Sequence, residues 1–183
     1  MKRVSVVGTT GSGKTTVARA LAAMLGSPHI ELDALFWGPH WTMAEIPVFR
    51  SRVASVVGGD GWVVDGGYSV VRDIVWSRAD TVVWLDYPLA VILPRLLRRI
   101  VARIRDRAEL WPGTGNRETF RNAFLSRDNL LWFAIRTHRG RRRRIRETLA
   151  RPEFARLVVH RFRETREAEG WLEAQRRLVA PRM

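Results

Sequence analysis

A run of eight residues near the N-terminus constrains this chain more than any other feature. Residues 8–15 read G-T-T-G-S-G-K-T, which is the G-x-x-x-x-G-K-T pattern of a loop that wraps a phosphate chain. Its glycines let amide N–H groups turn inward around an anion, and a following helix adds the positive end of its dipole. The apolar run Arg3–Val7 and the Ala/Leu-rich stretch Thr15–Leu25 supply the strand and helix that such a loop requires. We therefore expect an α/β fold that binds a nucleotide.

Each position in this loop has an expected role toward a nucleoside triphosphate and Mg²⁺. Lys14 is expected to place a point charge on the β- and γ-phosphates and to act in catalysis. The Thr15 hydroxyl is expected to ligate Mg²⁺. The residues predicted to bind the nucleotide are Gly8, Thr9, Thr10, Gly11, Ser12, Gly13, Lys14, Thr15 and Thr16.

Short β-rich runs alternate with helical patterns along the chain, which is typical of a parallel sheet flanked by helices. We predict a single-domain, three-layer α/β sandwich of the P-loop NTPase class, with five parallel strands and a helical insertion before the last strand. The expected strands are Arg3–Val7, His29–Leu32, Trp62–Val64, Thr81–Leu85 and Leu157–His160. The expected helices are Thr15–Leu25, Val48–Val57, Leu89–Arg107, Glu118–Ile135 and Glu164–Leu178, with a loop over Ala34–Trp41 and a turn over Trp111–Asn116.

The net charge of +14 is distributed unevenly along the chain. Residues 1–90 hold 8 basic and 8 acidic side chains, whereas residues 91–151 hold 17 arginines against 5 acids. Such a block predicts anionic ligands, either phosphates or nucleic acid. The chain has no cysteine, which excludes thiolate catalysis and Cys-based metal sites. With neither a signal peptide nor a membrane-spanning run in view, we expect a soluble, cytoplasmic protein without a membrane partner.

The sequence also bears on what happens to the γ-phosphate. Lys2 and Lys14 are the only lysines, so an Asn-Lys-x-Asp motif for reading guanine cannot exist. Two acids are expected at strand ends, Asp65 and Asp86, and neither has a neighbouring glutamate to activate water. These features favour phosphoryl transfer to an organic acceptor over hydrolysis.

Three segments and the Arg-rich C-terminal half carry a resemblance to a known family. The loop Gly8–Thr15 is followed by I-E-L-D-A-L-F-W at Ile30–Trp37 and by W-V-V-D-G-G-Y at Trp62–Tyr68. Together they resemble the adenylate-kinase-like P-loop kinases. More narrowly, they resemble the small proteins known as DNA topology modulation proteins or adenylate-kinase-related kinases. The resemblance covers essentially the whole chain and implies ATP as the donor, with Mg²⁺ and a small-molecule or nucleotide acceptor.

The resemblance also assigns residues around the donor. It implies that Asp65 holds Mg²⁺ through water, that Arg95 stacks on the adenine, and that Arg99 grips the phosphates in catalysis. Arg95 and Arg99 follow Asp86 by nine and thirteen residues, the spacing seen in such kinases. Arg163 resembles a residue that borders the adenine. Each arginine could instead belong to an exposed basic face.

A lid is expected within residues 109–151, between two core segments, 1–108 and 152–183. Such a lid closes over the transferring phosphate, excludes water and supplies arginines. Its candidates are Arg117, Arg121, Arg127 and Arg136, of which Arg127 and Arg136 are favoured as catalytic residues.

For the acceptor, the resemblance points to residues that follow two of the strands. Asp33 is expected to accept or orient a hydroxyl proton, which favours a hydroxyl acceptor over a phosphate. Trp37 with its aromatic neighbours is expected either to floor an acceptor pocket or to pack the lid. The remaining acceptor-binding candidates are Gly66, Tyr68 and Arg72, with Arg72 as a clamp for an acceptor phosphate.

Residues Arg139–Arg146 hold six arginines in eight positions, more than a lid requires. One interpretation is a contact, nonspecific in character, with a nucleic-acid backbone. The other is a solvated helix face or part of the lid in an arginine-rich chain. Two functional hypotheses follow: an ATP-dependent phosphotransferase, and a nucleic-acid-binding protein with the nucleotide as a switch that affects DNA topology.

Overall fold

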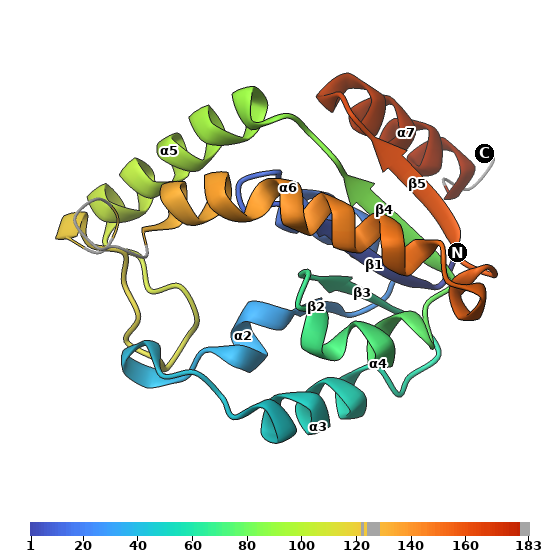
Figure 1. The fold of residues 1–183 in the computed structure, drawn as a ribbon, viewed down its shortest axis with the longest axis horizontal. Helices are drawn as coiled ribbons and strands as arrows, with labels where there is room; N and C mark the ends of the chain where they lie inside the picture. The colour runs from blue at the N-terminus through green and yellow to red at the C-terminus, as the bar shows by residue number, and fades with distance from the viewer. Residues whose placement is uncertain (122, 124–128, 180–183) are drawn as a thin grey trace.

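The computed structural model describes residues 1–121, 123 and 129–179 of the 183-residue chain (Figure 1). Its strands are β1 (Arg3–Gly8), β2 (His29–Glu31), β3 (Trp62–Asp65), β4 (Thr81–Leu85) and β5 (Val158–Phe162). Its longer helices are α1 (Lys14–Leu25), α3 (Ile46–Val56), α5 (Leu89–Asp106), α6 (Leu130–Leu149) and α7 (Thr165–Val179). Short helices complete the fold: α2 (Leu32–Phe36), α4 (Arg72–Trp76), η1 (Pro39–Trp41), η2 (Ser69–Val71) and η4 (Pro152–Phe154).

The five strands form one parallel sheet in the order β2-β3-β1-β4-β5. This arrangement confirms the predicted sheet. The chain moves outward from β1 to β2, returns to β3 on one side of β1, and then crosses to β4 on the other side. The strand order therefore reverses at β1, and open α/β sheets bind ligands at the carboxyl ends of strands beside such a reversal. The glycine-rich loop begins at this point.

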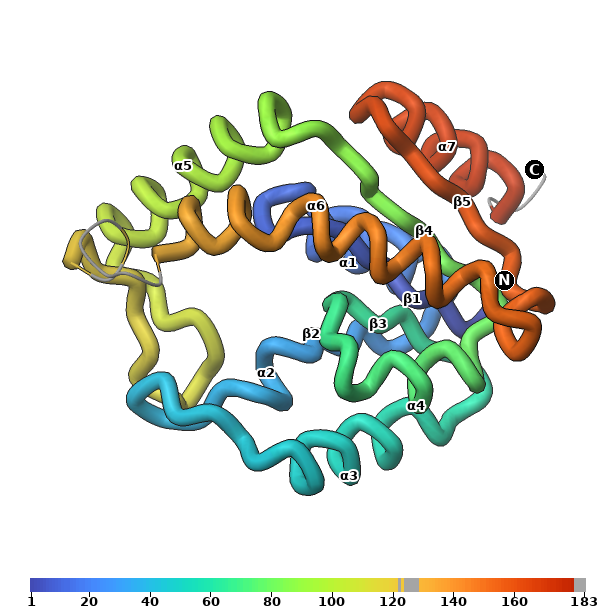
Figure 2. The backbone as a smooth tube through the Cα atoms, viewed as in Figure 1, coloured from blue at the N-terminus to red at the C-terminus, as the bar shows by residue number. Residues whose placement is uncertain are grey.

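Helices cover both faces of the sheet, which gives the predicted three layers (Figure 2). In β1, Val4 and Val6 pack against α1 and α7 on one face. Val7 faces the other side, where α3, α4 and the C-terminal part of α6 contribute to the core. Ile145 of α6 belongs to this second cluster and is almost completely buried. Because both faces are covered, the strands can be apolar along their whole length.

A third, smaller cluster joins α5 to α6 away from the sheet. Leu96 and Ile100 of α5 are fully buried there against Ala123 and Ala134. Arg98 and Arg105 of α5 are exposed, and so are Leu97 and Val101, which the sequence pattern placed on its apolar face. The described part of the insertion before β5 therefore lies in two places: residues 109–121 follow the end of α5, whereas the C-terminal half of α6 packs over the sheet (Figure 1).

Two sequence-based predictions about elements are wrong. Residues 34–36, expected in a loop, and Leu32, expected in a strand, belong to the short helix α2. The helix expected over Glu118–Ile135 is interrupted at Asn129, whose backbone is extended and whose side chain accepts a hydrogen bond from the Trp132 N–H at 2.8 Å. This N-cap starts α6, which continues through the arginine run to Leu149. Within the described ranges, no helix is long and apolar enough to cross a membrane.

Candidate active site

The glycine-rich loop has the backbone conformation that its sequence predicts. Gly11 and Gly13 adopt positive φ angles of 84° and 89°, which glycine tolerates at no steric cost. At Gly11 a side chain would also meet Leu96 of α5 at 2.9 Å, so the loop packs closely on that helix. Helix α1 begins at Lys14, and the Lys14 ammonium group curls back to donate to the Thr9 carbonyl at 3.3 Å. Burial lowers the pKa of Lys14, while the nearby Asp65 carboxylate opposes that shift.

Thr15 and Asp65 meet across the carboxyl ends of β1 and β3. The Thr15 hydroxyl donates a hydrogen bond to Asp65 Oδ2. Asp65 ends β3 and is only 6% exposed, and burial raises its pKa although Lys14 lowers it. A hydroxyl and one carboxylate are oxygen ligands of the kind that Mg²⁺ shares with substrate phosphates. Among the described residues, no cluster of three or more acidic, His or Cys ligands forms a complete metal cage.

Most of the predicted site residues line one pocket of about 680 Å³. Residues 10–16 of the loop line it, whereas Gly8 and Thr9 lie behind it: a side chain at Gly8 would meet the Leu85 carbonyl at 2.8 Å, and Thr9 is buried. The predicted residues Asp33, Trp37, Asp65, Arg95 and Arg99 also line this pocket. Arg103, Trp111 and Glu118 are among the lining residues that were not predicted from the sequence.

Three arginines of α5 border the pocket at intervals of one helical turn. Arg95 donates to the Thr165 hydroxyl at 3.0 Å and lies 5.7 Å from the centre of the Tyr87 ring. Arg99 donates to the Thr10 hydroxyl at 3.1 Å, and burial lowers its pKa to about 10. Arg103 continues the same row. Residues four apart lie on the same face of a helix, so Arg95 and Arg99 border the pocket together. Arg103, four residues further along, borders it for the same reason.

Asp33 lies in the first turn of α2, directly after β2, and is paired with Tyr68. The Tyr68 hydroxyl donates to Asp33 Oδ1 at 2.6 Å. Burial raises the pKa of Tyr68, and the Asp33 charge raises it further. Tyr68 therefore remains a neutral phenol that holds one carboxylate oxygen, while Asp33 itself lines the pocket.

An aromatic row forms the pocket wall next to Asp33. The Trp37 and Trp41 rings meet edge to face at 5.8 Å, and the Trp41 and Trp111 rings do so at the same distance. All three indoles line the pocket, and Phe36 packs behind Trp37 at 5.1 Å. Trp37 and its neighbour Trp41, expected either to floor an acceptor pocket or to pack the lid, both line this pocket. Trp111 comes from a turn 70 residues later, so sequence proximity could not indicate it.

Besides Gly8 and Thr9, five of the predicted site residues do not line this pocket, and one of them, Tyr68, reaches it only through its hydrogen bond to Asp33. Arg72 donates to the Thr148 hydroxyl at 3.1 Å and lies over the Trp76 ring, outside the pocket lining. Gly66 packs so closely on α2 that a side chain there would meet Leu32 at 2.8 Å. Arg136 and Arg163 have exposed positions away from the lining, although Thr165, two residues after Arg163, lines it. Arg127 lies outside the described residues.

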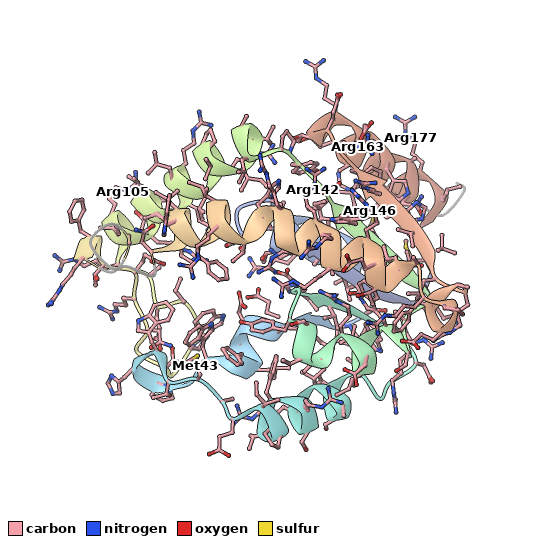
Figure 3. The ribbon with its side chains drawn as sticks, viewed as in Figure 1. Met43, Arg105, Arg142, Arg146, Arg163 and Arg177 are labelled. Carbon is pink, nitrogen blue, oxygen red and sulfur yellow. The ribbon has the colours of Figure 1, made fainter. Side chains whose placement is uncertain are left out.

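The arginine run of α6 divides into an inner and an outer set. Arg141 and Arg142 turn toward the sheet: Arg141 donates to the Gly67 carbonyl at 3.4 Å, and Arg142 donates twice to Asp86, at 2.5 and 3.0 Å. Arg139, Arg143, Arg144 and Arg146 are exposed. Figure 3 shows Arg142 in the interior of the view, whereas Arg105 and Arg177 lie nearer its rim. Two arginines of the run therefore make hydrogen bonds inside the protein and do not belong to a solvated face.

Helix α6 also contacts the glycine-rich loop directly. His138 is buried, and its Nδ1 lies 3.0 Å from the Thr9 hydroxyl, behind the loop. Arg142, one helical turn along, reaches Asp86 at the end of β4. The loop is therefore braced by a helix more than 120 residues away, which no local sequence signal could indicate.

Comparisons with known proteins agree with this geometry. No family model matches the chain. A shikimate kinase from Halorhodospira halophila is 37% identical over 111 residues, which cover 51% of this chain and 61% of that relative. The match therefore spans little more than half of either protein.

Solved structures resemble the chain over nearly its whole length. A shikimate kinase from Acinetobacter baumannii, solved in complex with shikimate, matches 98% of this chain and 93% of its own with a TM-score of 0.51 and 21% identity. A sugar kinase from Janibacter matches 99% and 96% with a TM-score of 0.54 and 19% identity. At these identities the likeness establishes the fold. The chain has the P-loop NTPase fold of these kinases.

Proposed function

We propose that this chain is an ATP- and Mg²⁺-dependent phosphotransferase that moves the γ-phosphoryl group to a hydroxyl of a small molecule. The observation that carries the proposal is that Asp33 and Lys14 line the same pocket. A hydroxyl held at Asp33 would face the terminal phosphate held at the loop. The sequence relative named as a shikimate kinase supports the same class of reaction.

The donor end of the pocket fits a nucleoside triphosphate. The amides of the loop, Lys14 and Arg99 would surround the phosphates, and Arg95 between Tyr87 and Thr165 would border the base. Thr15 and Asp65 would hold Mg²⁺, which supplies charge neutralisation for the phosphate oxygens. Preorganised cations of this kind stabilise the charge that develops in the transition state.

The acceptor end fits a hydroxyl. Tyr68 occupies Asp33 Oδ1, which leaves Oδ2 to accept the proton of an acceptor hydroxyl. The hydroxyl oxygen forms a bond to the γ-phosphorus as the bond to the β,γ-bridging oxygen breaks, and the hydroxyl proton passes to Asp33. A phosphate acceptor would need no such base. It would need a clamping cation, and Arg72 is engaged with Thr148 outside the pocket.

The test is a search for a phosphorylated product. The purified chain is incubated with ATP, Mg²⁺ and a panel of small hydroxyl compounds that begins with shikimate, and both ADP and the product are measured. Asp33→Asn should lower kcat by about 100- to 10,000-fold, the range for removal of a general base, with ATP binding retained. Asp60→Asn, at an exposed position away from the pocket, should match the wild type. ADP release that never yields a phosphorylated compound, or an Asp33→Asn variant with full activity, would contradict the proposal.

A further inference from the structure

The far side of the pocket is formed by a hairpin, residues 109–118. Its ends are joined by an antiparallel bridge between Glu109 and Arg117, and the Leu110 N–H donates to the Asn116 carbonyl at 2.9 Å. A further bond runs from the Gly115 N–H to the Glu109 carboxylate at 2.7 Å. The hairpin thereby has a defined conformation and contributes Leu110, Trp111 and Glu118 to the pocket lining.

Glu118 is a buried carboxylate with one oxygen that lacks a hydrogen bond. The residue is 7% exposed, and its Oε2 accepts no hydrogen bond from any described residue. It forms an ion pair with Arg103, whose guanidinium nitrogen lies 3.8 Å away, beyond hydrogen-bond distance. Burial raises the pKa of Glu118, and Arg103 and Arg99 oppose that shift. Buried polar atoms are almost always paired in folded proteins, so an unpaired one calls for a reason.

Because Glu118 lines the pocket, a ligand in the pocket can supply the donor that this oxygen needs. The charge around it indicates which kind of donor. Two guanidinium groups, Arg99 and Arg103, already act on the carboxylate, so a further cation is disfavoured. A neutral hydroxyl can donate without adding charge. Trp41 and Trp111 line the same pocket and offer apolar faces to the carbon skeleton of such a compound.

We propose that Glu118 binds a second hydroxyl of the acceptor, distinct from the one that is phosphorylated at Asp33. The inference rests on the proposed function and narrows its substrate class to polyhydroxy compounds with an apolar face. Hydrogen bonds from a hydroxyl to a buried carboxylate also discriminate strongly, because an analogue that lacks the hydroxyl leaves the carboxylate unpaired.

The experiment uses the full chain with shikimate, myo-inositol and ribose, each beside an analogue that lacks one hydroxyl. Binding is followed by tryptophan fluorescence and turnover by ADP release. Glu118→Leu should raise the KM or Kd for the polyol by about 10- to 150-fold, the loss of a hydrogen bond to a charged group. The KM for ATP should stay within about twofold. Glu118→Gln keeps the shape and an acceptor oxygen, so its effect should be smaller.

A matched substrate comparison separates recognition from folding. The wild type should discriminate against the analogue that lacks the recognised hydroxyl, whereas Glu118→Leu should treat both compounds alike. Glu147→Gln, which removes an exposed carboxylate from α6, serves as the charge control and should match the wild type.

Each result decides the inference. Glu118 variants that change only the KM for ATP, or that leave polyol binding unchanged, would overturn it and assign Glu118 to the phosphate-binding arginines. Polyol binding that depends on Glu118 without any turnover would support the inference and contradict the proposed transferase. A wild-type chain that neither binds nor phosphorylates any of these polyols would contradict both.

Discussion

Asp86 is a buried carboxylate that forms ion pairs with two arginines from different elements. It follows β4, and its side chain has no exposed surface. Arg142 of α6 donates to it at 2.5 and 3.0 Å, and Arg161 of β5 donates from Nε at 2.8 Å. Arg161 also lies 4.4 Å from the centre of the Trp84 ring. The carboxylate therefore joins three elements at the sheet edge that borders the site.

Asp86→Asn should destabilise the fold strongly. Two partly buried arginines would lose their counter-ion. Removing one partner of a buried ion pair costs up to about 3–5 kcal/mol in the free energy of unfolding. Urea denaturation measures this loss, and the melting temperature should fall by on the order of 10 °C. Asp106→Asn removes an exposed carboxylate that also pairs with an arginine, and should leave the midpoint unchanged. Equal midpoints for the two variants would refute the role assigned to Asp86.

His138 makes the stability of the chain depend on pH. Burial lowers its pKa below the ordinary value of 6.5; Arg142 and Arg139 lower it further, and Asp86 opposes them. The unfolded chain therefore binds a proton at a higher pH than the folded chain, so this residue's contribution to stability falls as pH drops below about 6.5.

His138→Asn tests this linkage because the amide can still pair with Thr9 but does not titrate. Between about pH 7.5 and 5.5, the wild type should lose more of its free energy of unfolding than the variant does. Urea midpoints at several pH values measure the difference, and His160, whose pKa is also lowered, is present in both proteins. Parallel pH profiles would show that His138 is not the titrating group.

At the residue scale, the sequence predicted those site residues whose positions follow from a motif. Lys14 and Thr15 are fixed by the loop, and Asp33 and Asp65 by the ends of parallel strands, which meet at one edge. Arg72 was misplaced because its direction depends on α6, which packs against it late in the chain. Glu118 was missed because nothing local distinguishes a buried glutamate from an exposed one.

At the element scale, one asparagine fastens two loops together over the pocket. Asn116 is 1% exposed; its Oδ1 accepts from the Trp41 N–H at 2.8 Å and its amide donates to the Gly38 carbonyl at 2.9 Å. Trp41 has a φ angle of 60°, a left-handed conformation that is costly for a bulky side chain. The two hydrogen bonds of Asn116 hold this strained backbone and keep Trp41 against Trp111.

Asn116→Ala should release the Trp41 segment. Two buried polar groups would lose their partners, at about 1–3 kcal/mol in the free energy of unfolding. The relaxed backbone should separate the Trp41 and Trp111 rings, which circular dichroism detects as a weaker exciton couplet between the two indoles. Asn116→Asp keeps the acceptor for Trp41 but loses the donor to Gly38, and should be intermediate. An unchanged couplet in Asn116→Ala would show that Trp41 is held by other contacts.

The elements themselves were predicted where the pattern is strong. All five strands lie within two residues of their predicted ends, because short apolar runs between breakers have few alternatives. Pro47 lies in the first turn of α3, a position that suits proline because its fixed φ angle matches that of a helix. The prediction of one helix over Glu118–Ile135 was wrong because Asn129, within that range, acts as an N-cap and starts a new helix.

At the scale of the whole molecule, the structure explains the positions of only some of the arginines that concentrate positive charge in residues 91–151. Arg95, Arg99 and Arg103 border the pocket, and Arg141 and Arg142 are directed inward from α6. Four arginines of the run remain exposed, and three of them, Arg139, Arg143 and Arg146, form an outer stripe that the helical spacing of three and four residues places on one face.

The outer stripe allows a direct test of the nucleic-acid hypothesis. If it forms a contact, changing Arg139, Arg143 and Arg146 together to Gln should lower duplex affinity and reduce the slope of log K against log salt by about 3, since each phosphate contact contributes about 0.9. Kinase turnover should not change, because these side chains are exposed and outside the pocket lining. Fluorescence anisotropy of a labelled duplex between about 50 and 200 mM KCl measures the slope.

The matched control changes Arg105, Arg176 and Arg177 to Gln, which removes the same charge from exposed positions elsewhere. A localised contact predicts that only the α6 variant loses slope, because counterions are released only where phosphates are bound. Equal losses in both variants would mean that the duplex responds to net charge alone. In that case the arginine run has no separate nucleic-acid function, and its inner members, held at Asp86 and Gly67, account for its structural role.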